Sequence, residues 1–512
     1  MTAGLDPAAL QVLISRLTGI AEEMGAVLRR AAFSPNIKER ADCSAALFTA
    51  EGEMLVQAEH IPVHLGSMPA SVQAAIDAFG DRVRPGDQVV VNDPFAGGTH
   101  LNDVTLVAPC FVDGRLVGWA ANRAHHADVG GAAPGSIPAD AVEIHQEGLR
   151  IPPTLLDDGV RRLLVANSRT PEERLGDLAA QTGANVVGVE RLAEVVAGGA
   201  PLDEVVDYGE RRMRVALGDL PDGTWRFADV LDSTGAAPDQ QRPARIQVAV
   251  TVAGEEVTVD FTGTDPQARG NVNAVEAVTV SAVSFALRSA IDPTLPANGG
   301  AMRPVRVVAP PGTIVAARPP AAVGAGNVEV SQRVADVVLG ALAEPCAARV
   351  PAAGQGTMNN LLVGGDGWVY YETVAGGQGG RPGAAGMSGV HTGMTNTRNT
   401  PIEALERAFP LRVLRQRLRR GSGGAGRHPG GEGIERDLLV LEDVTLSLIT
   451  ERRVSRPWGL HGGEPGAPGE NWLLPGGDEA RAERLPDKCT RRLRAGDVVR
   501  MRTPGGGGWG AP

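Results

Sequence analysis

The chain has 512 residues, 43% of them hydrophobic and 21% charged, which is typical of a globular enzyme with roughly two to four domains. Its formal net charge of −11 argues against broad nucleic-acid binding, which needs concentrated positive charge. Four widely spaced cysteines, no signal core at the start and no apolar run of membrane-spanning length lead us to expect a cytoplasmic protein without disulfides or membrane contact.

The N-terminal segment is predicted to form a long amphipathic helix. Asp6-Pro7 has the pattern of an N-cap followed by proline at the first helical position. Apolar side chains such as Leu10 and Leu17 then recur at helical spacing as far as about residue 32. We expect this helix to pack into the core or against another subunit.

A β-hairpin is predicted over residues 45–58, with its turn at Glu51-Gly52. Asp42 stands at the entrance of this hairpin, where a carboxylate can point out of the sheet end; a turn or capping residue is the simpler interpretation. His60 and His64 flank the next loop, which opens a helix. Loop histidines are usually polar surface residues, although either one could contact a site.

Two segments with polar side chains then follow apolar strands. The first, N-D-P-F-A-G-G-T-H-L-N-D, occupies residues 92–103 between valine-rich runs and is predicted to be a bent loop between two strands. A second hairpin turns at Asp113-Gly114, and its last strand runs into N-R-A-H-H-A-D at residues 122–128. Polar side chains therefore gather at the ends of neighbouring strands.

These two segments contain the residue types of a divalent metal site. His100 and Asp103 have the spacing H-x-x-D, and His125 or His126 can join them. Histidine and carboxylate ligands suit zinc, manganese or iron; hydrogen-bonded loop residues are the alternative. Because side chains alternate along a strand, the two adjacent histidines cannot face the same way, so one of them lies beside the metal or in the core, with Asp128 on the face of His126.

The remainder of the chain changes character near residue 220. Helices are predicted over about 171–196 and 205–217, whereas strands with Gly/Asp turns follow residue 223 and the final third is dense in glycine. We predict an α+β fold with mixed sheets and long packing helices in several domains. The expected division is an N-terminal metal-bearing domain (1–220) and a strand- and glycine-rich region (221–512) that completes the site and the partner interface.

Motifs for nucleotide binding or covalent catalysis are absent from the sequence. The string at residues 421–426 matches G-x-G-x-x-G but lacks the flanking strand and helix, which favours a structural or anion-contacting loop. The sequence has no G-x-x-x-x-G-K-[ST] and no G-x-S-x-G.

Seven strings in a fixed order carry a resemblance to a known family. They are NDPFAGGTHLNDV, NRAHHADVGG, EGLRIPP, AAVGAGNVEVSQRV, MTNTRNTPIE, RPWGLHGGEPGAPG and TPGGGGWG. Together they resemble the hydantoinase B/oxoprolinase family, which includes N-methylhydantoinase B subunits, 5-oxoprolinase, caprolactamase subunits and subunits of acetone and acetophenone carboxylases. The resemblance covers nearly the whole chain. At His391-Thr392-Gly393 the sequence departs from it, since a second histidine is expected in place of Gly393.

The resemblance implies a metal site and a partner. The matching positions make Asp42, His100, Asp103 and His125 the metal ligands, and His126 and Asp128, which adjoin them, candidate catalytic residues. A hydantoinase A-type subunit is implied as the ATP-using partner in a hetero-oligomer, in keeping with the missing phosphate loop.

Three functions follow as hypotheses. The first is the hydrolytic B-type subunit of an ATP-dependent cyclic amidase, acting on a substrate phosphorylated by the partner. The second is a subunit of an ATP-dependent acetone- or acetophenone-type carboxylase. The third, a non-catalytic scaffold, is disfavoured by the presence of every implied ligand.

Overall fold

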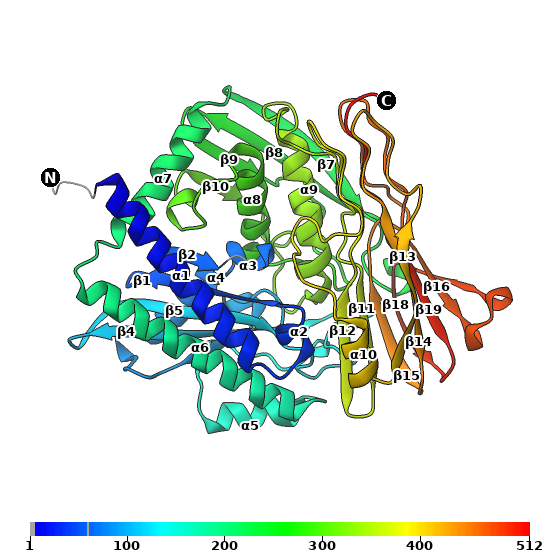
Figure 1. Cartoon of the computed structure of the whole chain (residues 1–512), viewed down its shortest axis with the longest axis horizontal. Helices are drawn as coiled ribbons and strands as arrows, with labels where there is room; N and C mark the ends of the chain where they lie inside the picture. The colour runs from blue at the N-terminus through cyan, green and yellow to red at the C-terminus, as the bar shows by residue number, and fades with distance from the viewer. Residues whose placement is uncertain (1–5, 59–60) are drawn as a thin grey trace.

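The computed structural model describes residues 6–58 and 61–512. Its first part is built on a six-stranded antiparallel sheet with the order β2-β1-β5-β4-β3-β6 (Figure 1). The predicted hairpins are present; at the second turn, Asp113 (φ 51°) and Gly114 (φ 75°) adopt the positive φ values that a tight hairpin requires. The strands are β1 (Cys43–Thr49), β2 (Met54–Ala58), β3 (Val89–Val91), β4 (Asp103–Val112), β5 (Arg115–His125) and β6 (Thr154–Leu155).

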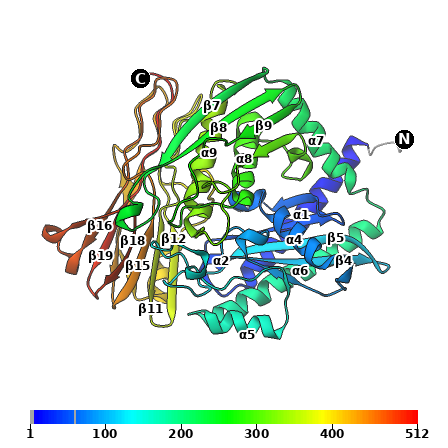
Figure 2. The same ribbon diagram turned by 180° about the vertical axis from the view of Figure 1, so that it is seen from behind.

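Helices cover both faces of this sheet. The long helices α1 (Pro7–Ala31) and α6 (Pro171–Ala197) pack against each other and against one face, while α4 (Met68–Phe79) packs on the other (Figures 1 and 2). Both long helices lie where the apolar periodicity predicts them. The first part also contains α2 (Pro35–Lys38), α3 (Pro62–Leu65), α5 (Asp158–Asn167) and α7 (Asp203–Gly218).

A second, four-stranded sheet follows in the order β10-β9-β8-β7. β10 is parallel to β9, whereas the other pairs are antiparallel, so the sheet is mixed. The helix α9 packs against β7 and β8, and α8 packs against α9. The elements are β7 (Gly223–Leu231), β8 (Ala244–Ala253), β9 (Glu256–Asp260), α8 (Glu276–Ile291), β10 (Val305–Val308) and α9 (Ser331–Leu342).

The C-terminal part is a pair of sheets that share one apolar core, seen at the right of Figure 1 and the left of Figure 2. One sheet has the order β12-β11-β15-β18 and the other β13-β14-β19-β16-β17. The elements are β11 (Asn360–Gly365), β12 (Trp368–Thr373), α10 (Ile402–Ala408), β13 (Leu411–Arg419), β14 (Gly433–Val440), β15 (Val444–Ile449), β16 (Glu470–Leu474), β17 (Glu483–Leu485), β18 (Lys488–Leu493) and β19 (Val498–Arg502).

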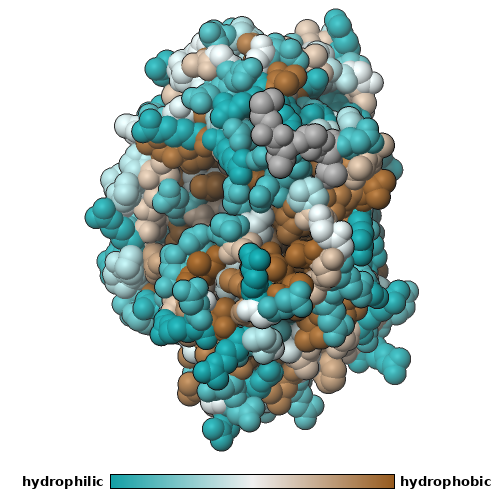
Figure 3. Space-filling view, turned by 90° about the vertical axis from the view of Figure 1, so that its left-hand side faces the viewer, coloured by the Kyte–Doolittle hydropathy of each residue, from teal (hydrophilic) through white to brown (hydrophobic). Residues whose placement is uncertain are grey.

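The predicted α+β class with mixed sheets is confirmed by this architecture. The division at residue 220 stays a prediction: α7 ends at Gly218 and β7 begins at Gly223, but one apolar core cluster contains side chains from both sides, such as Leu178 and Val250. Seen from the left-hand side of Figure 1, hydrophobic side chains gather in the hollow between the upper and lower parts (Figure 3).

The glycine strings of the final third pack against one another. Four segments, 376–380, 422–431, 457–467 and 504–510, exchange backbone hydrogen bonds; we call them the glycine bundle. Gly506 N, for example, donates to Gly431 O at 2.9 Å. A Cβ on Gly506 would lie 2.1 Å from the carbonyl oxygen of Gln378, so no side chain fits there. The G-x-G-x-x-G string belongs to this bundle, in agreement with its structural interpretation.

Glu147 joins two of the strings that carry the family resemblance, EGLRIPP and AAVGAGN. Its buried carboxylate accepts hydrogen bonds from the backbone nitrogens of Val323 (3.0 Å) and Gly324 (2.8 Å). Burial raises the pKa of Glu147 from 4.5 to about 8, although the two backbone N–H groups oppose the shift. The carboxyl group is therefore mostly protonated at neutral pH.

We expect stability to fall with pH in a way that depends on Glu147. The pKa of Glu147 in the folded protein lies above 4.5, the ordinary value for a glutamate. Its contribution to the free energy of unfolding is therefore fully present below pH 4.5 and is lost as the pH rises through about 8. The Glu147→Gln variant stays neutral, so the wild-type free energy of unfolding should decrease relative to it by up to about 1.4 kcal/mol per pH unit across this window. Urea unfolding of both proteins from pH 5 to 8 measures this; parallel profiles would contradict it.

Candidate metal centre

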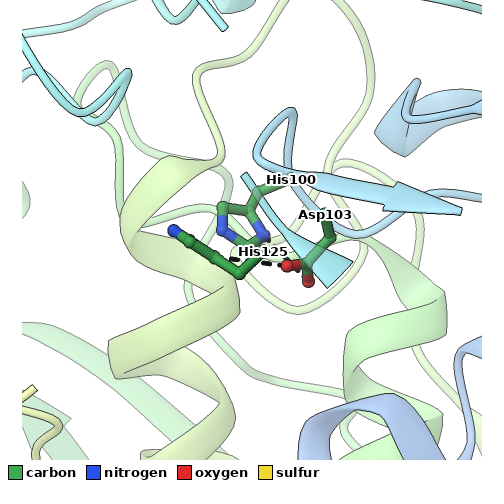
Figure 4. Close-up of side chains that lie close together, drawn as sticks. All are labelled: His100, Asp103 and His125. Atoms are coloured by element: carbon green, nitrogen blue, oxygen red, sulfur yellow. Dashed lines mark ion pairs between the residues drawn. The ribbon is translucent and has the colours of Figure 1, made fainter. Parts of the chain in front are cut away.

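The sheet places two of the predicted ligands opposite each other. Asp103 begins β4 and His125 ends β5, and the antiparallel register pairs these residues directly. Directly opposite side chains on one face of a sheet are close neighbours. His100 stands in the turn before β4, so all three side chains meet at one sheet end (Figure 4).

The ligand atoms of these three buried residues lie within 4.8 Å of one another. His100 Nδ1 is 3.2 Å from Asp103 Oδ2, and His125 Nδ1 is 3.3 Å from Asp103 Oδ1. Ligands at about 2.1 Å from one ion stand roughly 3 to 3.5 Å apart, so these separations suit a shared cation. Of the residues that the structure describes, this is the one such group of histidine, cysteine or acidic side chains.

The charge states and unpaired atoms also fit a metal ion. Burial alone would raise the pKa of Asp103, but the imidazoles of His100 and His64 hold it well below its usual range. Burial lowers the pKa of His125, which favours the neutral imidazole that binds metals. Within the described chain, the Nε2 atoms of His100 and His125 are buried without a hydrogen-bond partner. Such atoms are costly unless a ligand satisfies them.

The carboxylate of Asp103 is oriented by neighbours that sequence reasoning did not select. Thr99 Oγ1 donates a 2.8 Å hydrogen bond to Asp103 Oδ2, and Asn327 Nδ2 contacts the same oxygen at 3.3 Å. Asn327 lies in a single π-helical turn, Gly326–Val330, a feature that often occurs at functional sites. No sequence pattern around Thr99 or Asn327 connects them to Asp103.

His64 belongs to the site, although loop histidines are usually surface residues. It is buried in α3, and its Nε2 lies 3.5 Å from Asp103 Oδ2. The other ring nitrogen is hydrogen-bonded to Ser44 Oγ at 2.9 Å, which fixes the ring. His60, the other histidine of this loop, lies outside the described residues. The one sequence signal for His64 was its place in a loop that opens a helix.

A tyrosine from the C-terminal sheets completes the centre. The ring of Tyr371 in β12 stacks on His125 with centroids 4.7 Å apart. Arg40 lies over the same tyrosine ring at 4.8 Å and donates to the Tyr371 carbonyl at 2.7 Å. Tyr371 OH donates to Asn360 Oδ1 at 2.8 Å, and Asn360 Nδ2 donates to buried Glu329 Oε1 at 2.8 Å. The plane of His125 is thereby held by residues from distant parts of the chain.

We expect the stacking ring, rather than the hydroxyl, to support metal affinity. The Tyr371→Leu variant should bind Zn²⁺ at least about tenfold more weakly, because residues that orient a ligand typically contribute that much. Tyr371→Phe keeps the ring and should bind within about threefold of wild type. Chelator competition measures both affinities.

Tyr370 provides a matched control for this prediction. It is the adjacent residue in β12 and equally buried, but it packs against Phe409 (centroids 5.2 Å) within the C-terminal sheets. Tyr370→Leu should therefore lower stability and leave Zn²⁺ affinity unchanged. Equal Zn²⁺ affinities for Tyr371→Leu and wild type would show that the stack has no role in binding.

Asp42 lies beside this cluster but not within it. The residue is buried just before β1, and its backbone carbonyl accepts a 3.0 Å hydrogen bond from His125 N. Its carboxylate is not among the atoms that lie within 4.8 Å of one another. Its role as a fourth ligand stays a prediction.

His126 and Asp128 form hydrogen bonds with residues outside the metal cluster. His126 Nε2 is 2.9 Å from Gln181 Oε1 in α6, on the side away from His125, as strand alternation predicts. The Asp128 carboxylate accepts hydrogen bonds from Gly130 N (3.1 Å) and Arg169 Nη1 (2.8 Å) and so fixes the loop after β5. These contacts supply a structural reason for both residues, and their predicted catalytic roles stay predictions.

The fold and the centre thus define an α+β protein with a buried His/Asp cluster at the end of its first sheet. The sequence model of the Hydantoinase B/oxoprolinase family matches residues 6–512. The chain belongs to this family. It is 37% identical to 5-oxoprolinase 1 of Arabidopsis thaliana and 33% identical to the B-type subunit of a putative D-/L-hydantoinase of Pseudomonas sp..

These relatives differ in length. Each alignment covers 99% of this chain, but it spans 42% of the Arabidopsis protein and 90% of the Pseudomonas protein. Among solved structures, an ATP-dependent caprolactamase from Pseudomonas jessenii aligns over 99% of this chain and 92% of its own, with a TM-score of 0.90 and 29% identity. An acetone carboxylase shares the fold, with a TM-score of 0.88, 20% identity and coverage of 99% and 76%. No helix of the described chain is long and apolar enough to cross a membrane.

Proposed function

We propose that this chain is the metal-bearing, hydrolytic B-type subunit of an ATP-dependent cyclic amidase. The observation that carries the proposal is the buried cluster of His100, Asp103 and His125, with ligand atoms within 4.8 Å of one another. It occurs in a family whose relatives include a 5-oxoprolinase and, among solved structures, an ATP-dependent caprolactamase. A divalent zinc, manganese or iron ion, when bound, supplies a Lewis acid that polarises a carbonyl group or acidifies water.

The protein's own residues prepare the site for that chemistry. Thr99 and Asn327 hold the Asp103 carboxylate in one orientation, and Ser44 fixes the ring of His64. Each of the three cluster residues is at most 3% exposed, which keeps bulk water away from the reacting group. These positions are set before a substrate arrives, so little reorganisation is needed during reaction.

The ATP-dependent step is assigned to a partner. The sequence lacks a phosphate-binding G-x-x-x-x-G-K-[ST] motif, and the Pseudomonas relative is named as one subunit of a larger hydantoinase. We propose that an A-type subunit transfers the γ-phosphoryl group of ATP to the amide oxygen. Water then attacks the activated carbon at the cluster, and the C–N bond opens to leave an amine and an acyl phosphate. A second water hydrolyses the acyl phosphate to a carboxylate and free phosphate. The complex is proposed to be a cytoplasmic hetero-oligomer.

The carboxylase alternative draws on the acetone carboxylase fold match. In that case a phosphorylated enol would react with bicarbonate-derived carbon beside the same cluster. A scaffold without catalysis is the third candidate, and the preserved cluster disfavours it.

Co-expression with the neighbouring A-type subunit distinguishes the candidates. The amidase proposal predicts ATP-dependent ring opening of a hydantoin, 5-oxoproline or lactam, which is lost in Asp103→Asn. A product that carries ¹³C from bicarbonate would establish the carboxylase instead. ATP turnover without dependence on Asp103 would favour the scaffold.

A further inference from the structure

A large pocket lies between the second sheet's helices and the glycine bundle. Its volume is about 690 Å³, and α8, α9, the loop 391–396 and the segment 348–356 contribute its walls. Figure 1 shows α8 and α9 side by side at the centre of the molecule. The volume is sufficient for a small organic ligand.

The charge that lines this pocket is positive, whereas the net charge of the whole chain is negative. Arg349 and Arg381 line its exposed rim, and neither guanidinium has an ion-pair partner in residues 6–58 and 61–512. Among the described lining residues the single acid is Asp336, which already receives a 2.9 Å ion pair from Arg452. The pocket therefore has uncompensated positive charge in a chain whose formal net charge is −11.

Two of the helices that line the pocket also lead to residues of the metal centre. Pro62 lines it and begins α3, which carries His64. Gln332 lines it from the helix that continues the turn containing Asn327, and its Nε2 donates to Thr392 O at 2.9 Å. The pocket therefore shares α3 with the centre, and α9 directly follows the turn that contains Asn327.

Polar groups of the lining also lack protein partners. Thr395 Oγ1 and His391 Nδ1 are buried and, in the part of the chain that the structure describes, neither has a hydrogen-bond partner. His391 Nε2 is bonded to Asn399 Oδ1 at 3.2 Å. Buried polar atoms without partners are uncommon in native proteins, and a bound ligand is one way to satisfy them.

We propose that this pocket binds the phosphoryl group of a small phosphorylated ligand, with Arg349 and Arg381 as its counter-charges. Guanidinium groups pair with phosphate in a bidentate geometry and remain charged at any working pH. The identity of the ligand rests on the proposed function: it is the phosphorylated cyclic amide that the partner delivers. The pocket then receives this anion in a wall that includes Pro62, the first residue of the helix that carries His64.

Calorimetric titration of the isolated full chain with methyl phosphate tests the pocket. Wild type should bind the probe, and the Arg349→Gln/Arg381→Gln double variant should bind it at least about tenfold more weakly. Arg412→Gln is the matched control, because Arg412 is also exposed and without an ion pair in the described chain, but lies on β13 outside the pocket lining. Inorganic phosphate is the second titrant, and its affinity compared with that of methyl phosphate shows whether the pocket prefers the free anion or a phosphate ester. Neutral 2-pyrrolidone is the third titrant and should give the same result with all three proteins.

Equal methyl phosphate affinities for wild type and the double variant would overturn the proposal, and so would an absence of binding to wild type at millimolar concentration. Tighter binding of inorganic phosphate than of methyl phosphate would assign the pocket to the free anion and contradict the ester. With the partner present, ring opening by the double variant at wild-type KM would refute the pocket alone. Arginine-dependent binding without ring opening would refute the proposed function alone.

Discussion

The Asp103→Asn variant is expected to lose its metal ion. Asp103 contacts His100, His125 and His64 within 3.2 to 3.5 Å, so it is the central charge of the cluster. Asparagine preserves the shape and removes that charge. Because residues that only orient ligands contribute about 10- to 100-fold to metal affinity, loss of a central ligand should exceed about 100-fold. The rate of ring opening should fall by at least the same factor as the metal affinity.

Elemental analysis of purified protein measures this effect, with circular dichroism to check folding. His145→Ala is the control, because His145 is an exposed histidine outside the cluster and should retain full metal content. A folded His100→Ala/Asp103→Asn double variant with wild-type metal occupancy would remove this ligand assignment.

The second large effect concerns stability. We expect Arg452→Met to lower the free energy of unfolding by about 3 to 5 kcal/mol, the usual cost of breaking a buried ion pair from one side. Arg452 Nη2 lies 2.6 Å from Asp229 Oδ2 and 2.9 Å from Asp336 Oδ2, and the arginine is 1% exposed. Methionine would leave both carboxylates with Arg333 as their remaining cationic neighbour.

This network links the second sheet and its helix α9 to the C-terminal part, since Asp229 lies in β7, Asp336 in α9 and Arg452 just after β15. Arg420→Met is the control: Arg420 pairs with Glu432 at 2.9 Å but is 81% exposed, so its loss should cost less than about 1 kcal/mol. Urea unfolding measures both variants. Equal destabilisation by the two substitutions would contradict the importance of the buried network.

Local structure followed closely from the sequence. The helices over residues 7–31 and 171–197 and both N-terminal hairpins were predictable, because apolar periodicity and turn residues act over a few positions. The pairing of Asp103 with His125 was not predictable in the same way, because a turn at Asp113-Gly114 alone would place Asp103 opposite Ala124. A register shift between Cys110 and Phe111 moves His125 into that position.

The surroundings of the cluster were decided by tertiary structure. His64, Asn327 and Tyr371 come from separate elements, and nothing in their local patterns indicates contact with Asp103 or His125. Tyr371 reaches His125 from β12 and is held there by Arg40, which comes from the segment before β1. The role of the glycine strings likewise depends on contacts between backbones that are distant in the chain.

By itself, the sequence determined the helices, the hairpins and three side chains suited to a cation, because these depend on short-range periodicity, turn residues and residue type. Only the tertiary structure decided which other groups orient those side chains, that His126 contacts Gln181, and that two unpaired arginines line one pocket. Such contacts join residues far apart in the chain, and their selection depends on the packing of whole elements.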